Sequence, residues 1–86
     1  MSRPPIDQAP WQPWIDHVCT AVGVDPAAVD VRAIHDLTGA VAEAYERPMA
    51  PVSAHLWGLA HGAGADPDAV RTALLDAIGY VMERRW

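Results

Sequence analysis

The chain has few side chains suited to chemistry: four histidines, one cysteine and scattered carboxylates. His55 and His61 are six residues apart, which places them on different faces of a helix, whereas a metal-binding pair recurs at i and i+4. A site formed by His17, Cys19 and His35 is disfavoured because Cys19 falls on an apolar helical face from which His17 points away. We therefore expect solvated or hydrogen-bonded histidines and no metal site.

The candidates for catalysis are equally sparse. Cys19 has no neighbouring base in the sequence, and its place on an apolar face is typical of a small buried hydrophobe rather than a nucleophile. Acid–base catalysis needs two carboxyl groups with different pKa values in one cleft. Asp36 is the carboxylate of most interest because it adjoins the apolar face at Leu37, and it either pairs with Arg47 or is solvated. We expect no catalytic residues and no enzymatic activity.

A second kind of chemistry, anion binding, is suggested around Arg47. We expect a helix to begin at Pro51, close to this arginine. The guanidinium, the Ser53 hydroxyl and the free N–H groups of the helix would together bind phosphate, carboxylate or an oxyanion, with Asp36 nearby. In the alternative, Arg47 caps the carbonyls that end the preceding helix. The sequence favours capping but leaves both interpretations open.

The four tryptophans point towards binding rather than catalysis. Trp14 fits an apolar helical stripe and is expected in the core. Trp11, Trp57 and Trp86 lie at chain ends or off the stripes, where exposed indoles favour protein interfaces. In an alternative of equal weight, Trp57 packs across helices and Trp86 folds back over the first helix.

These residues must be positioned by helices, since no segment alternates with the period of a strand. Residues 1–10, which carry three prolines, are predicted to form an extended leader, and residues 11–86 a single helical domain. Caps and apolar spacing predict four helices, at residues 11–22, 31–46, 51–61 and 67–85.

The turns between these helices have recognisable signals. Gly23 is expected to end the first helix in the left-handed conformation, and Asp25, Asp30 and Asp66 to cap helical turns. The segment from Gly23 to Val29 matches that from Gly64 to Val70 at five of seven positions, through duplication or, as we favour, convergent turn chemistry. The predicted fold is an all-α, small four-helix bundle built from two αα-hairpins.

Length and charge restrict the class of protein further. The chain has 86 residues, of which 51% are hydrophobic, and a net charge of −5. An acidic surface disfavours nucleic-acid binding, and no apolar run approaches the roughly 18 residues of a membrane span. The absence of a secretory signal and the single cysteine favour the cytoplasm. Because so short a chain buries little apolar area, we expect a protein partner or a homodimer to complete it.

Several short patterns resemble those of a known family: Trp14-Ile15, Val18-Cys19, Gly23-Val24-Asp25-Pro26, Asp36-Leu37, Val41-Ala42, Arg47-Pro48-x-Ala50-Pro51 and Gly58-Leu59-Ala60-x-Gly62. They resemble a small uncharacterised helical domain of high-GC bacteria, which occurs alone or appended to molybdenum cofactor guanylyltransferase-like proteins. The resemblance covers about residues 13 to 82. Members of that family often have a histidine near the positions of Glu43 or Ala44. This chain has none there, which weakens the case for carrying over a metal-binding role from the family.

The resemblance implies a setting rather than an activity: molybdenum cofactor maturation, or a molybdoenzyme such as formate dehydrogenase. We expect a non-enzymatic interaction or accessory module with a protein partner in that pathway and no cofactor of its own. The alternative is a small protein that binds an anion or cofactor, such as phosphate, molybdate or a molybdopterin-type ligand. A DNA-binding regulator ranks last, because no helix gathers basic residues.

Overall fold

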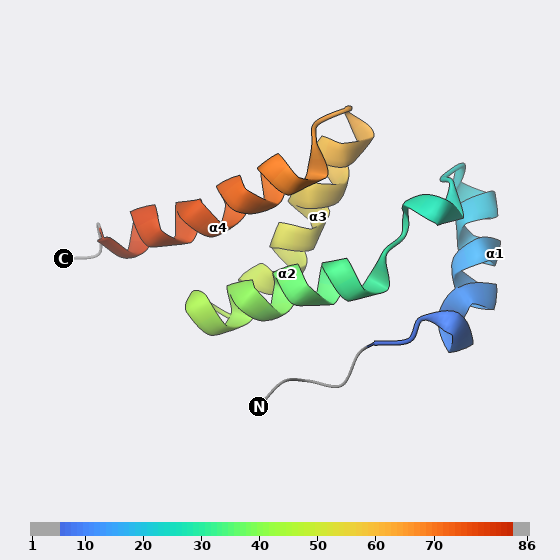
Figure 1. Ribbon diagram of the computed structural model, residues 1–86, viewed down its shortest axis with the longest axis horizontal. Coiled ribbons are helices and arrows are strands. Elements are labelled where there is room, and N and C mark those ends of the chain that lie inside the picture. The colour runs from blue at the N-terminus through green and yellow to red at the C-terminus, as the bar shows by residue number, and fades with distance from the viewer. Residues whose placement is uncertain (1–5, 84–86) are drawn as a thin grey trace. The chain divides into compact units, whose positions relative to one another are not determined.

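A computed structural model of the chain describes residues 6–83. Across these residues the backbone is helical, with no strand (Figure 1). The elements in chain order are η1 (Ala9–Trp11), α1 (Gln12–Val22), η2 (Pro26–Ala28), α2 (Val31–Ala44), α3 (Met49–Gly62) and α4 (Pro67–Glu83), where η denotes a 3-10 helix. The prediction of a small, all-α helical bundle with four main helices is confirmed.

The helix ends follow the predicted turn chemistry. Gly23 ends α1 with φ of 74°, in the left-handed region that glycine enters without steric cost. The Asp25 carboxylate accepts the N–H of Ala27 at 3.0 Å and so caps η2. Asp30 accepts the N–H of Ala33 at 3.0 Å and caps α2 in the same way.

The start of α3 differs from the prediction. The Met49 N–H donates to the Glu46 carbonyl at 3.0 Å, and the Ala50 N–H donates to the Arg47 carbonyl at 3.0 Å. These bonds tighten the connector into a turn, so the helix begins at Met49 instead of Pro51. Pro51 is tolerated in the first turn because N–H groups there have no partner within the helix.

The hairpin of α3 and α4 turns at Gly64, whose φ is 92°. Asp66 then caps α4 by accepting the Ala69 N–H at 3.0 Å. The two helices pack against each other over this short turn. The predicted C-cap glycine and N-cap aspartate are therefore both present.

The chain divides into two compact units, residues 1–35 and 36–86. The boundary falls within α2, between His35 and Asp36. Ala9 and Pro10, predicted to be part of the extended leader, belong to the 3-10 helix η1. Pro4 and Pro5 lie outside the described residues.

In the first unit, η1 and η2 both pack on α1. Ile15 and Cys19 are the buried residues of α1. Trp14, expected in the core, is instead 69% exposed, so that expectation was wrong.

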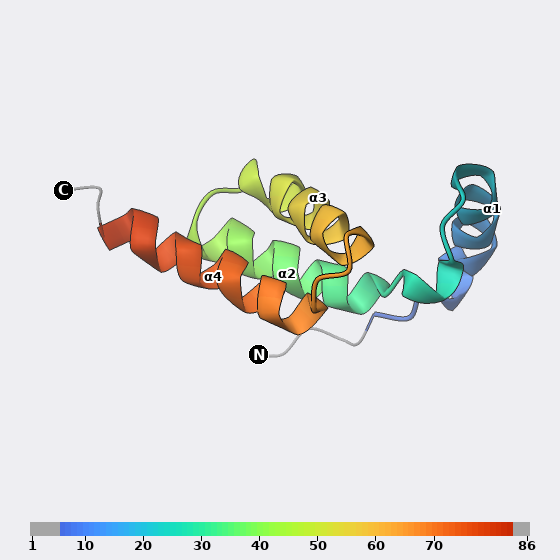
Figure 2. The same cartoon turned by 90° about the horizontal axis from the view of Figure 1, so that it is seen from above.

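In the second unit the core joins α2 to α4. Leu37, Val41 and Ile78 form its buried centre, and Leu37 is fully buried. Partly buried side chains from α3, α4 and the residue that follows α2 pack around this centre: Tyr45, Met49, Trp57, Leu74 and Leu75. Figure 2 shows α2, α3 and α4 beside one another, and side chains from these helices line a partly open cavity.

Candidate functional site

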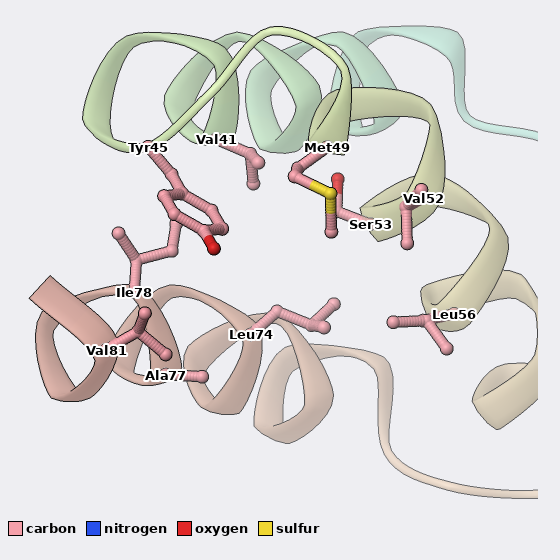
Figure 3. A pocket seen from close by; sticks show the side chains of 10 residues that line it. All are labelled: Val41, Tyr45, Met49, Val52, Ser53, Leu56, Leu74, Ala77, Ile78 and Val81. Atoms are coloured by element: carbon pink, nitrogen blue, oxygen red, sulfur yellow. The ribbon is translucent and has the colours of Figure 1, made fainter. Parts of the chain in front are cut away.

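The second unit contains a partly open cavity of about 120 Å³. Its lining comes from α2 and the residue that follows it, from α3 and from α4: Val41, Tyr45, Met49, Val52, Ser53, Leu56, Leu74, Ala77, Ile78 and Val81 (Figure 3). The only side-chain oxygens in this set belong to Tyr45 and Ser53, so the walls are almost wholly apolar. Such a cavity suits an apolar group rather than an ion.

Ser53, one of the residues suggested for an anion site, lines this cavity. The residue is only 5% exposed. Its hydroxyl donates to the Ala50 carbonyl of its own helix at 2.6 Å, which uses the one proton it can donate. The Ser53 hydroxyl therefore has no further proton to donate to an anion bound beside Arg47.

Arg47 and Asp36 are both exposed. The main chain of Arg47 helps to start α3, since its carbonyl accepts the Ala50 N–H. Asp36 lies eight residues before the end of α2, a separation of about 12 Å along the helix axis.

Trp57 is half-buried between α3 and α4. Its indole N–H donates to the Pro67 carbonyl at 2.9 Å, and its ring packs against the core cluster. This is the packing alternative that the sequence left open. Trp86, the other candidate of the second unit, lies outside the described residues.

The rim of the cavity is exposed and apolar. Val52, Leu56 and Leu59 follow one another along a single stripe of α3, and Val81 of α4 is also exposed. Helix α3 contains no Asp, Glu, Lys or Arg. A helix that is apolar around most of its circumference is typical of one covered by other protein.

The first unit has a separate apolar hollow of about 450 Å³. It is lined by Trp11, Trp14, Ile15, Val29, Val31 and His35. Trp11 and Trp14 are three residues apart and therefore share a helical face, with 50% and 69% of their surfaces exposed. The predicted interface residue Trp11 is thus exposed, and Trp14 joins it.

Two of these features could not be predicted from periodicity. Trp14 occupies a position of the α1 stripe that usually points inward, so its pattern alone placed it in the core. The cavity depends on side chains from three helices that are distant in sequence. The absence of charge from residues 49–62 was the one signal that could have pointed to the exposed face of α3.

Cys19 is a buried free thiol. Within residues 6–83, no three His, Cys, Asp or Glu side chains are grouped so as to hold a metal ion. None of the helices in this range has the length and apolar character needed to cross a bilayer.

A family model matches residues 7–85 of the chain, and its description is Domain of unknown function (DUF6457). The match covers nearly the whole sequence, so the chain belongs to this family. No curated protein and no solved structure matches it.

Proposed function

We propose that this chain is a non-enzymatic interaction module that binds a protein partner at the apolar hollow of the first unit, which Trp11 and Trp14 help to line. The observation that carries the proposal is the pair of exposed indoles beside an apolar hollow of about 450 Å³. Leaving two such rings in water is unfavourable, and burying them against a partner contributes large contact area with little loss of side-chain entropy.

The charges of the first unit suggest the chemistry of this partner. Between residues 6 and 35 there are four aspartates and one arginine. A partner segment with an apolar centre and basic flanks would complement both the hollow and this charge. We propose that the partner belongs to molybdenum cofactor maturation or is a molybdoenzyme such as formate dehydrogenase, a setting supported by the sequence resemblance alone.

The alternative, a carrier for phosphate, molybdate or a pterin ligand, has less support. It depended on Arg47, Ser53 and Asp36, and the Ser53 hydroxyl is buried and already hydrogen-bonded. We therefore do not propose it as the function.

Affinity capture from the source organism tests the proposal. Immobilised wild-type protein should retain a molybdenum-pathway protein or a molybdoenzyme, identified by mass spectrometry. Trp14→Ala should reduce the retained amount at least tenfold, because contact area and an aromatic anchor are lost together. Leu59→Ala, a change at another exposed apolar residue, should leave it unchanged. Capture that Trp11→Ala and Trp14→Ala both leave unaltered, or no capture of a protein of this class, would contradict the proposal.

A further inference from the structure

The apolar face of α3 and α4 in the second unit is not used by the proposed function. It consists of the cavity of about 120 Å³ and the exposed residues Val52, Leu56, Leu59 and Val81 at and beside its rim. We propose that this face binds the same face of a second copy of the chain, forming a two-fold symmetric dimer.

Charge is the first argument for a second copy as the occupant. The chain carries a net charge of −5, so two copies repel each other over most approaches. Helix α3 has no Asp, Glu, Lys or Arg along its 14 residues. Two copies that meet along α3 therefore avoid placing like charges opposite each other on these helices.

Shape is the second argument. A symmetric dimer requires a self-complementary patch, in which a protruding group on each copy enters a recess on the other. The face provides both: Leu59 is 58% exposed, and Leu56, one turn earlier on α3, is 46% exposed and lines the cavity. The cavity is close in volume to the roughly 150 Å³ of a known apolar cavity that admits benzene, so it has space for a leucine side chain.

Area is the third argument. Helix α3 is about 21 Å long by its residue count, and two packed helices are about 18 Å wide. Covering such a face, about 380 Å² on each copy, would bury on the order of 800 Å² in total, which is below the range of stable specific interfaces. An interface of this size suits a weak, reversible dimer rather than an obligate one.

Sedimentation velocity at 2–200 μM, with native mass spectrometry, tests this proposal. The wild-type protein should pass from monomer to dimer across this range. Leu59→Asp should remain monomeric at 200 μM, because each dimer would bury two carboxylates in an apolar contact. Since Leu59 is exposed, this variant should retain the helical circular dichroism of the wild type.

Two further variants make the outcome decisive. Val24→Asp introduces the same charge at an exposed valine of the first unit and should dimerise like the wild type. Ala77→Phe narrows the cavity from α4 and should weaken the dimer at least tenfold. A wild-type protein that stays monomeric at 200 μM would overturn the proposal. A dimer that is unaffected by Leu59→Asp would also overturn it. If Trp14→Ala then disrupts that dimer, the interface lies on the first unit instead.

Discussion

The indole N–H of Trp57 donates to the main-chain carbonyl of Pro67 at 2.9 Å. Trp57 lies in the middle of α3, and Pro67 is the first residue of α4. The bond therefore fastens the body of one helix to the start of the next, across the turn at Gly64. It also gives the half-buried indole the polar partner that such a ring requires.

Trp57→Phe should lower the free energy of unfolding of the second unit by about 1 kcal/mol, because the ring contact is largely kept while the hydrogen bond is lost. Urea denaturation followed by far-UV circular dichroism measures the change. Trp14→Phe is the matched control and should be neutral, since Trp14 is mostly exposed. Equal losses in the two variants would show that the bond to Pro67 does not stabilise the hairpin.

Gly23→Ala should destabilise the chain by about 1 kcal/mol, because an L-residue is strained at a φ of 74°. A methyl group at this position meets no atom within 4 Å, so the cost comes from backbone conformation and not from a clash. Gly79→Ala, within α4 and equally open, should stabilise by about 0.5–1 kcal/mol. Thermal unfolding of both variants checks the opposite signs, and a shift in the same direction would contradict the assigned cause.

Gln8→Ala should loosen the first unit. The Gln8 amide N–H₂ donates to the Gln12 side chain at 2.8 Å and to the Val29 carbonyl at 3.2 Å, and its oxygen accepts the Val31 N–H at 3.0 Å. Losing these bonds should speed hydrogen exchange at the Val31 amide about fivefold to tenfold, which corresponds to about 1 kcal/mol.

Gln8→Glu provides the control for this experiment. A carboxylate keeps the acceptor for the Val31 N–H but cannot donate to Val29, so it should protect Val31 better than alanine does. Val31 exchange that is unaltered in both variants would show that this bridge is not formed in solution.

Ser53→Ala should change the free energy of unfolding by less than about 1 kcal/mol. It removes a hydroxyl whose single bond, to Ala50, lies within its own helix, and it leaves an apolar wall in the cavity. Ser53→Asp should cost about 3 kcal/mol or more, because a carboxylate would be buried without a cation. Chemical denaturation measures both, and tolerance of Ser53→Asp would indicate that the position faces water or a bound cation.

Much of the fold could be predicted locally. The ends of α1, η2 and α4 are encoded by Gly23, Asp25 and Asp66, because a left-handed C-cap and a side-chain N-cap need only a few neighbouring residues. The buried stripe of α2, at Leu37 and Val41, also follows from helical periodicity. The first turn of α3 was predicted two residues late, because backbone bonds in the connector extend the helix backwards to Met49.

The sequence by itself determined four helices, their caps and an acidic chain with an uncharged third helix, since each depends on residue types or short-range spacing. Only the tertiary structure decided which faces of those helices are covered. Trp14 and Ile15 are neighbours on the same predicted stripe, yet Trp14 is exposed and Ile15 is buried. Ser53 shows the reverse, since a residue chosen for a surface anion site is buried in an apolar cavity by helices remote from it in sequence. Burial depends on packing partners that the whole fold supplies, so residue types and short-range spacing do not determine which apolar surfaces stay exposed.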